Sequence, residues 1–270
     1  LEHVMLTLPI VKQLKKRQWR LIKDQFIFNI YKKNMIKKAM ILAAGFGKRI
    51  NPLTLKQPKP LLKIGNETLL SNTLKFLEQL GIKLVVVNVY YLGEQIIDYI
   101  NKNKFNLTIK IVKEKDKILD TGGGVLNAIQ HFANEPFLII NPDTIWSSYY
   151  LEELKLMEKA FFDAKKSKCS LLVVNKKKSF DQSFKGDFDL ENNLISRRHK
   201  NNLSYIYTGL QIIKPEVFSG VCDKIFSINI IWDKLIKRNE LFGIESNINF
   251  LHISNLDIYK DLTKKDLNIK

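Results

Sequence analysis

Four basic residues lie within one short stretch of the chain that has no acidic residue to balance them. The stretch reads ILAAGFGKRINPLTLKQPKPLL, and its candidate anion-binding side chains are Lys48, Arg49 and Lys59. Gly45 and Gly47 follow its apolar beginning, and glycines after a strand leave backbone N–H groups open to a phosphate. A plain strand-ending turn explains the two glycines about as well.

The prolines around Lys59 favour the phosphate interpretation. Pro58 and Pro60 restrict the backbone on both sides and predict that Lys59 is held in an extended pose. An immobilised lysine is costly unless it meets an anion. Two common phosphate motifs are excluded, because the spacing and following residues do not match a P-loop, and Ile50 stands where the dinucleotide fingerprint needs its third glycine.

An aspartate and a run of glycines are further candidates. Asp143 follows the apolar run PFLIIN, where a carboxylate suits Mg²⁺ because that ion prefers oxygen ligands. A turn or helix N-cap explains the same aspartate equally well on the pattern alone. Residues 122–124 are three consecutive glycines, which could contact a ligand or only open the helix that follows.

These candidates must be positioned by elements that alternate from Met35 onward. Apolar runs predict strands at residues 39–45, 82–90, 107–114, 136–141 and 169–175. Helical spacing predicts helices at residues 67–81, 93–103, 123–133 and 148–166. This order predicts an α/β fold, a Rossmann-like and mostly parallel sheet with helices on both faces.

The pattern changes after residue 176. Residues 186–198 read as a hairpin with Asn192 and Asn193 at its turn, followed by a strand at 204–214 and a helix at 228–240. This part predicts a small β extension of the sheet, or a lid over it. Residues 1–34 are rich in Lys and Arg with helical apolar spacing, and we interpret them as a basic helical appendage to a domain of residues 35–270.

The formal net charge of +17 raises the question of an anionic partner. Lys far outnumbers Arg and no nucleic-acid-binding motif is present, so we expect a lysine-rich surface and no nucleic acid. The two cysteines have no metal or redox spacing. No apolar run reaches the length of a membrane span, and the first residues lack a signal-peptide core, which predicts a cytoplasmic protein.

Eight segments together resemble one enzyme family. They are LAAGFGKRINPLT, PKPLL, VVNVYYLGEQI, LDTGGGVLNA, PFLIINPDTIW, KGDFDL, YTGLQIIKPEVF and FLHISNLDIY. Their order and spacing resemble the sugar-1-phosphate nucleotidyltransferases from Met35 to the C-terminus. TGGG, NPDTIW and GDFDL look most like the N-acetylmuramate-1-phosphate uridylyltransferase branch, whose close relatives are often called mannose-1-phosphate guanylyltransferases. The resemblance implies the nucleotide-diphospho-sugar transferase fold.

The resemblance also implies a reaction. A nucleoside triphosphate and a sugar 1-phosphate would give an NDP-sugar and pyrophosphate with Mg²⁺ as cofactor, most simply UTP with N-acetylmuramate 1-phosphate in cell-wall (peptidoglycan) sugar recycling. A phosphate monoester has a second pKa of about 6, so it is already ionised at pH 7 and needs no protein base. Charge neutralisation and in-line positioning are what the enzyme must supply.

Site residues follow from the resemblance position by position. Arg49 would hold the β- and γ-phosphates, Lys59 the α-phosphate or the sugar phosphate, and Asp143 the Mg²⁺ ion. The nucleotide-binding residues implied are Leu42, Ala43, Ala44, Gly45, Gly47, Asn88, Gly122 and Gly123. Asp187 and Gly209 correspond to sugar-binding positions, although Asp187 fits a hairpin residue better.

The chain departs from the family pattern in two places. Pro142 stands where a small residue is usual, and His252 stands where a second metal-binding aspartate is usual. Imidazole is a poor Mg²⁺ ligand, so Asp143 and phosphates would hold the ion alone, or Asp257 or Asp120 would help. We expect a lower metal affinity than in relatives, which an unchanged Mg²⁺ dependence of His252→Asp would contradict.

Other functions remain open from the sequence. The family members that use GTP and mannose 1-phosphate offer one alternative. A regulatory domain that binds nucleotide sugars without turnover is another, and His252 favours it whereas Arg49, Lys59 and Asp143 oppose it. The first 34 residues faintly resemble the tail of the anomeric sugar kinases that supply sugar 1-phosphates, which suggests functional coupling to such a kinase.

Overall fold

The computed structural model of the chain describes residues 35–198 and 203–265. The helical appendage predicted for residues 1–34 lies outside this range, and the domain division stays a prediction. Within the described ranges, no helix is both long enough and apolar enough to cross a membrane.

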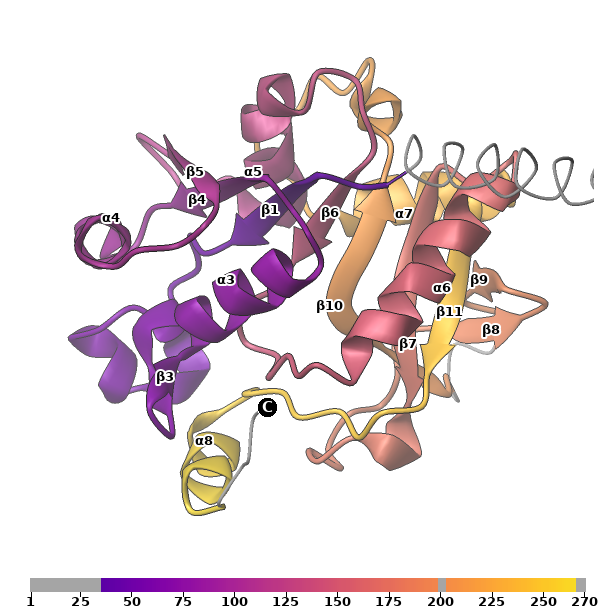
Figure 1. The fold of residues 1–270 in the computed structure, drawn as a ribbon. Coiled ribbons are helices and arrows are strands. Elements are labelled where there is room, and N and C mark those ends of the chain that lie inside the picture. Colours follow the sequence, from indigo (N-terminus) through magenta and orange to yellow (C-terminus); the bar gives the residue numbers. More distant parts are fainter. Residues whose placement is uncertain (1–34, 199–202, 266–270) are drawn as a thin grey trace, which may run out of the picture. The chain divides into compact units, whose positions relative to one another are not determined.

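A single large sheet forms the centre of the described part of the chain (Figure 1). Its nine strands are β1 (Lys38–Leu42), β4 (Leu84–Val89), β5 (Thr108–Lys113), β6 (Phe137–Ile140), β7 (Cys169–Asn175), β8 (Asp189–Glu191), β9 (Leu194–Ser196), β10 (Tyr205–Ile213) and β11 (Leu241–Ser246). Their spatial order is β5-β4-β1-β6-β10-β7-β11-β9-β8. The short strands β2 (Lys63–Ile64) and β3 (Glu67–Thr68) pair separately.

The sheet is mostly parallel, as the strand and helix alternation predicts. The strands β5, β4, β1 and β6 pair in parallel, and so do β7 and β11. The sequence did not indicate that β10 lies antiparallel between β6 and β7. Periodicity marks a strand but not its neighbours, so an inserted antiparallel strand leaves no local signal.

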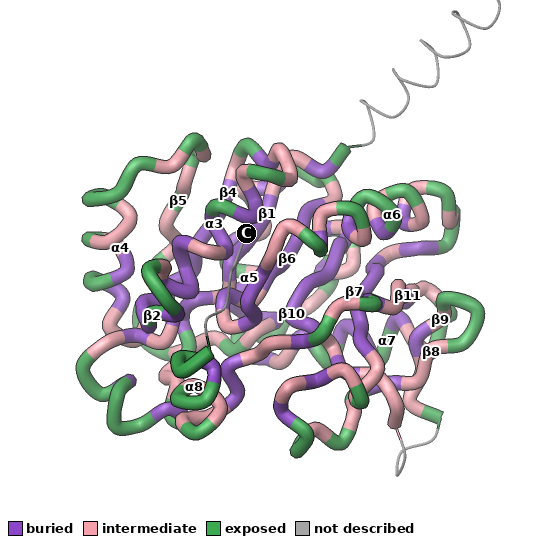
Figure 2. Tube along the Cα trace, turned by 60° about the horizontal axis from the view of Figure 1, so that its bottom comes forward, coloured by how far each residue is buried: buried purple, intermediate pink, exposed green. Residues whose placement is uncertain are grey.

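Helices cover both faces of this sheet, as expected. On one face, α3 (Leu69–Gln79), α4 (Gly93–Lys102) and α6 (Tyr150–Asp163) contribute to one buried cluster. On the other face, α5 (Asp120–Ala128) and α7 (Asn229–Lys237) contribute to a second cluster. Figure 2 shows the strands between them as the most continuously buried part of the trace. The last described helix is α8 (Leu256–Thr263).

Local sequence explains why α3 forms where it does. The Thr68 hydroxyl caps its beginning by accepting a hydrogen bond from the Ser71 N–H at 3.0 Å. Leu70, Leu74 and Leu77 recur at helical spacing and are fully buried. Gly81 follows the helix with a φ of 77°, a conformation that favours glycine. The predicted helix at residues 67–81 is therefore confirmed with slightly shorter ends.

The predicted hairpin is also confirmed. Asn192 and Asn193 join β8 to β9 with φ values of 50° and 62°, the pair of left-handed residues that a two-residue turn requires. Because β9 pairs with β11, this hairpin extends the main sheet and is not a lid.

The topology places one edge of the sheet where a ligand can bind. From β1 the chain moves to β4 on one side, and it later returns to β6 on the other side. The carboxyl ends of these neighbouring parallel strands meet at one edge, and the strand order reverses there. Open α/β sheets hold their ligands outside such a reversal point.

Candidate functional site

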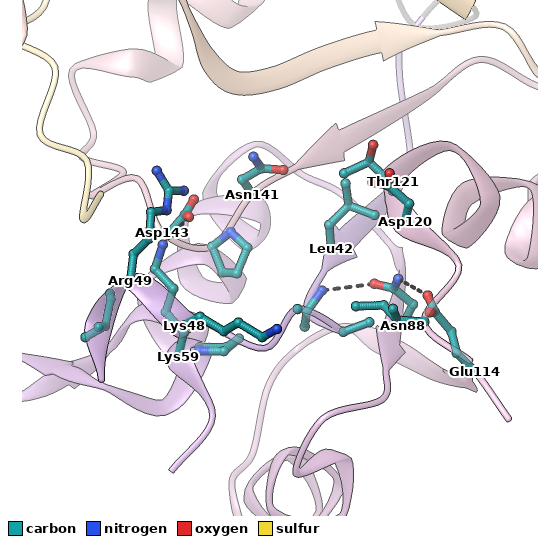
Figure 3. A pocket seen from close by; sticks show the side chains of 18 of the residues that line it. Leu42, Lys48, Arg49, Lys59, Asn88, Glu114, Asp120, Thr121, Asn141 and Asp143 are labelled. Carbon is teal, nitrogen blue, oxygen red and sulfur yellow. Dashed lines mark hydrogen bonds and ion pairs between the residues drawn. The ribbon is translucent and has the colours of Figure 1, made fainter. Parts of the chain in front are cut away.

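A cavity of about 410 Å³ lies at this edge of the sheet (Figure 3). Loops that follow β1, β5 and β6 supply most of its walls, together with Asn88 from β4. The residues that line it are Leu42, Ala43, Ala44, Gly45, Gly47, Lys48, Arg49, Ile50, Lys59, Pro60, Asn88, Glu114, Ile118, Asp120, Thr121, Asn141, Pro142, Asp143 and Ser254. Most of the predicted nucleotide-binding residues, both predicted catalytic cations and the predicted metal ligand are thus in one place.

The glycine loop after β1 turns the chain so that the side chains of Lys48 and Arg49 reach the cavity. Gly47 has a φ of 64° and precedes the 3-10 helix η1 (Lys48–Ile50). A Cβ atom on Gly47 would lie 3.0 Å from the Thr54 side chain, so both conformation and space favour glycine. The Thr54 hydroxyl lies 2.9 Å from the Gly47 carbonyl oxygen and holds the loop closed. This fold of the loop brings Lys48 and Arg49 to the cavity wall.

Lys59 has a different backbone from the one predicted. Pro58 is extended, with φ −66° and ψ 143°, but Lys59 begins the 3-10 helix η3 (Lys59–Leu61). The expected extended pose of Lys59 is therefore wrong, because Pro60 also fits the first turn of a helix. The ammonium group of Lys59 still points inward and forms an ion pair with Oδ2 of Asp143.

Asp143 is the anionic partner at this end of the cavity. Burial raises the pKa of its carboxyl group, but the Lys59 ammonium and the His252 ring outweigh burial and lower the pKa to about 2. Its Oδ1 atom is buried and has no hydrogen-bond partner in the described part of the chain. Asp143 is therefore ionised at neutral pH and has one oxygen available to a ligand.

His252 lies beside Asp143, as its place in the sequence pattern implies. The segment around His252 pairs with the segment after β6, because the Ile253 N–H donates to the Asp143 carbonyl oxygen at 2.8 Å. The His252 ring stacks on Phe250 with ring centres 5.5 Å apart, and its Nδ1 atom is 3.6 Å from Asp143 Oδ1. Burial lowers the pKa of His252 to about 4, so the ring is neutral at pH 7.

A hydrogen-bonded clasp forms the other end of the cavity. We use this name for Ala43, Asn88, Glu114 and Leu119. Asn88 Oδ1 accepts from the Ala43 N–H at 2.9 Å, and Asn88 Nδ2 donates to Glu114 Oε1 at 2.7 Å. Glu114 Oε2 accepts from the Leu119 N–H at 2.7 Å. The clasp joins the loops after β1 and β5 through Asn88 of β4, and burial raises the pKa of Glu114.

The sequence interpretation missed Glu114 although a signal was available. Glu114 directly follows β5, and Asp143 follows β6 with two residues between them. Glu114 therefore lies at a strand end on the same edge of the sheet as Asp143. The family resemblance pointed to Gly122 and Gly123, which come later in the chain, and not to Glu114. Thr121 and Asn141 also line the cavity and were not assigned, whereas Lys48 was already a candidate for binding an anion and Asp120 for helping to hold Mg²⁺.

The glycines of α5 have a structural role that differs from the predicted one. The N–H groups of Gly122 and Gly123 both donate to the Phe226 carbonyl oxygen, at 2.9 and 3.0 Å. A Cβ atom on Gly122 would lie 2.3 Å from the Phe226 ring, and one on Gly123 would lie 2.1 Å from the Lys224 carbonyl oxygen. These two N–H groups are therefore engaged within the protein, and backbone contacts of Gly122 and Gly123 with a nucleotide stay a prediction. The glycines allow α5 to pack against residues 224–228.

The two residues at predicted sugar-binding positions do not line the cavity. Asp187 accepts a hydrogen bond from the Tyr207 N–H at 2.9 Å, and burial raises the pKa of its carboxyl group. Gly209 lies in the irregular part of β10 with a φ of 93°, and its carbonyl oxygen accepts from the Asn141 N–H at 2.7 Å. Gly209 thus supports a lining residue, and a sugar contact at either position stays a prediction.

Residues 38–184, more than half of the chain, match the family model described as nucleotidyl transferase. The chain belongs to this family. It is 26% identical to the N-acetylmuramate alpha-1-phosphate uridylyltransferase of Caulobacter vibrioides, over 80% of this chain and 91% of that protein. It is 32% identical to the protein of the same name from Neisseria meningitidis serogroup B, over 68% and 78%.

Other relatives match a shorter part or only the fold. A probable mannose-1-phosphate guanylyltransferase 1 of Oryza sativa subsp. japonica is 35% identical over 43% of this chain, which spans 33% of that relative. The crystal structure of HddC from Yersinia pseudotuberculosis has a TM-score of 0.67 at 22% identity, covering 85% of this chain and 99% of that chain. The structure of UDP-glucose pyrophosphorylase in complex with UDP-glucose has a TM-score of 0.68 at 19% identity, covering 85% of this chain and 98% of that chain. The family, the enzyme class and the fold predicted from the sequence motifs are confirmed.

Proposed function

We propose that this chain transfers a nucleoside monophosphate from a nucleoside triphosphate to a sugar 1-phosphate and releases pyrophosphate. The observation that carries the proposal is the division of the cavity into two ends. Arg49, Lys59 and Asp143 lie together at one end, which we call the cation end, and the clasp lies at the other, while the Lys48 side chain extends between the two ends (Figure 3). The triphosphate of a nucleotide would bind at the cation end, and its nucleoside would lie toward the clasp.

The reaction needs no general base from the protein. An oxygen of the sugar phosphate attacks the α-phosphorus, the bond from that phosphorus to the bridging oxygen breaks, and pyrophosphate leaves with the bridging oxygen. The attacking phosphate is largely a dianion at pH 7, because its second pKa is about 6. Arg49 would stabilise the charge on the leaving pyrophosphate, and Lys59 would orient the α-phosphate or the incoming sugar phosphate.

The residues at the cation end fit one Mg²⁺ ion. Asp143 Oδ1 is buried and unpartnered in the described ranges, and Mg²⁺ is commonly held by one carboxylate with substrate phosphates and water. His252 is a neutral imidazole and a poor ligand for this ion. Asp120 lies at the clasp end, and Asp257 does not line the cavity. We therefore assign Mg²⁺ to Asp143 alone, where it would neutralise phosphate charge when bound.

UTP and N-acetylmuramate 1-phosphate are the substrates we propose first. Two relatives that match over most of their length carry the name of that uridylyltransferase. The match to a mannose-1-phosphate guanylyltransferase is slightly higher in identity but spans a third of that protein, so GTP and mannose 1-phosphate come second. Either sugar phosphate would be supplied by a kinase that acts on the anomeric hydroxyl of the sugar. For N-acetylmuramate, we place the reaction in cytoplasmic peptidoglycan-sugar recycling.

A substrate grid tests this proposal. Pyrophosphate release is measured with Mg²⁺ for UTP, GTP, dTTP and CTP against the 1-phosphates of N-acetylmuramate, mannose, glucose and N-acetylglucosamine. We expect turnover in the UTP and N-acetylmuramate cell. Turnover only with GTP and mannose 1-phosphate would keep the reaction and overturn the substrate assignment. No release in any cell would overturn the reaction and favour a binding domain.

A further inference from the structure

A second cavity, of about 670 Å³, borders the segment of residues 113–121. Its volume lies within the range of small-molecule sites. Two parts of the chain form its walls, residues 113–127 and residues 221–225. The second cavity shares no lining residue with the cavity at the edge of the sheet, so it is a separate place on the protein.

The segment of residues 113–121 lies between the two cavities. Residues 114, 118, 120 and 121 line the first cavity, whereas residues 113, 115–117 and 119 line the second. Leu119 connects the two walls of the second cavity to the clasp, because its N–H donates to Glu114 at 2.7 Å and its carbonyl oxygen accepts from the Phe226 N–H at 3.2 Å. A ligand in the second cavity would therefore contact the segment that carries the clasp.

The lining of the second cavity carries an excess of positive charge. Its one carboxylate is that of Asp116, because Asp223 lies next to the lining in the chain but is not part of it. Of its four lysines, Lys113 is paired with Glu94 at 2.7 Å. Among the described residues, no ion pair joins a carboxylate to the other three, which are the exposed side chains of Lys115, Lys117 and Lys224.

Apolar side chains line the same cavity. Ile225 is 51% exposed, although a side chain of this kind is usually buried. Leu119, Leu126 and Val221 are half-buried around it in the lining. A surface that only keeps the protein in solution has no need of a concave apolar site beside three unpaired lysines. The combination suits a ligand that has an apolar part and several negative charges.

We propose that the second cavity binds a small organic phosphate that carries an aromatic or apolar group. The apolar group lies on Leu119, Leu126 and Ile225, where it covers exposed apolar surface. The phosphates lie against Lys115, Lys117 and Lys224, because an ammonium group binds phosphate as a point charge. The site is separate from the one in the proposed function and does not depend on it.

Alkylation of Cys222 by iodoacetamide, followed by mass spectrometry, reports on the second cavity. Cys222 is exposed and lines this cavity, whereas the other cysteine of the chain, Cys169, is buried. ADP is the probe, and it should slow the alkylation about tenfold at about ten times its Kd, because only the unoccupied cavity reacts. Pyrophosphate has the charge without the aromatic group, and adenosine has the aromatic group without the charge, so each should protect less than ADP.

Two double variants locate the effect. Lys117→Glu combined with Lys224→Glu should abolish the protection by ADP, because two of the three unpaired cations become anions. Lys234→Glu combined with Lys237→Glu is the matched control, since it changes the net charge equally at exposed residues of α7 that do not line the cavity. The control should keep the protection. Urea denaturation establishes that both variants are folded.

Each contrary outcome overturns a stated part of the proposal. Wild-type protein whose Cys222 is not protected by ADP would overturn the site. Protection that persists in Lys117→Glu with Lys224→Glu would place the ADP elsewhere, and equal loss in the control variant would show general charge attraction. Adenosine or pyrophosphate that protects as well as ADP would overturn the ligand class. Because no arm measures pyrophosphate release, failure of the proposed function would leave this inference standing.

Discussion

The two ends of the cavity differ in how their polar groups are satisfied. At the clasp end, Asn88 and Glu114 use their side-chain oxygens and the Asn88 amide on neighbouring loops, and both are about 95% buried or more. At the cation end, among the described residues, Arg49 has no ion pair and Asp143 Oδ1 has no hydrogen bond. Polar groups that are satisfied hold a shape, whereas unsatisfied ones at a cavity are available to a ligand.

This difference separates the expected effects of mutation. Changes at the cation end should reduce catalysis more than stability, because those groups act on the ligand. Changes in the clasp should reduce stability and substrate affinity more than the catalytic rate, because those groups act on the loops.

The largest effect is expected for Asp143→Asn. The variant keeps the shape of the side chain but loses the charge that would hold the metal, so kcat should fall by about 10³-fold. Pyrophosphate release under saturating substrates measures this. Asp98→Asn, an exposed residue of α4, is the matched control and should retain activity. Full activity in Asp143→Asn would show that the Asp143 carboxylate has no role in the mechanism.

A pH effect on stability is expected next, from His252. The pKa of this ring is lowered from 6.5 to about 4 in the folded protein, so folding favours its neutral form. The resulting stabilisation is present above pH 6.5 and is lost as the pH falls toward 4, by about 3 kcal/mol in total.

Urea denaturation of wild-type protein and His252→Gln between pH 7 and pH 4 measures this contribution. The free energy of unfolding should fall more steeply with acid in the wild type than in the variant. Parallel curves would show that His252 is not buried in its neutral form. The Asp143 contribution lies at lower pH, because its pKa is lowered to about 2 and its stabilisation is lost only between about pH 4 and pH 2.

The smallest effect is expected for Glu114→Ala, in the clasp. The variant leaves the Asn88 amide and the Leu119 N–H without their partner, so the free energy of unfolding should fall by about 2 kcal/mol. KM for the triphosphate should rise more than kcat falls. Glu94→Ala is the control, because Glu94 is an exposed carboxylate paired with Lys113 at 2.7 Å, and such pairs contribute little. An equal fall in the free energy of unfolding of Glu114→Ala and Glu94→Ala would contradict the structural role of the clasp.

Much of this arrangement could be predicted from the sequence, because the signals are local. The glycine turn before Arg49 and the aspartate after a buried strand each follow from a few consecutive residues, and the structure brings them together. The Asn192–Asn193 turn is local in the same sense.

The remaining features depend on residues far apart in the chain. The packing of Gly122 and Gly123 against Phe226 has no signal in the local sequence, because Phe226 lies about a hundred residues further along the chain. Glu114 has a function only with Asn88 beside it, and β10 is antiparallel only because of its neighbours in space. The backbone of Lys59 was wrongly predicted because proline tolerates both an extended strand and a first helical turn.

The most direct test of the central claim compares wild-type protein with Arg49→Ala. The rate of pyrophosphate release is measured for both in the active cell of the substrate grid, with Mg²⁺ and saturating substrates. The account predicts turnover by the wild type and a loss of at least about 10²-fold in the variant, because one preorganised charge on the leaving group is removed. Equal rates in the two proteins would contradict the assignment of the cation end to the leaving pyrophosphate.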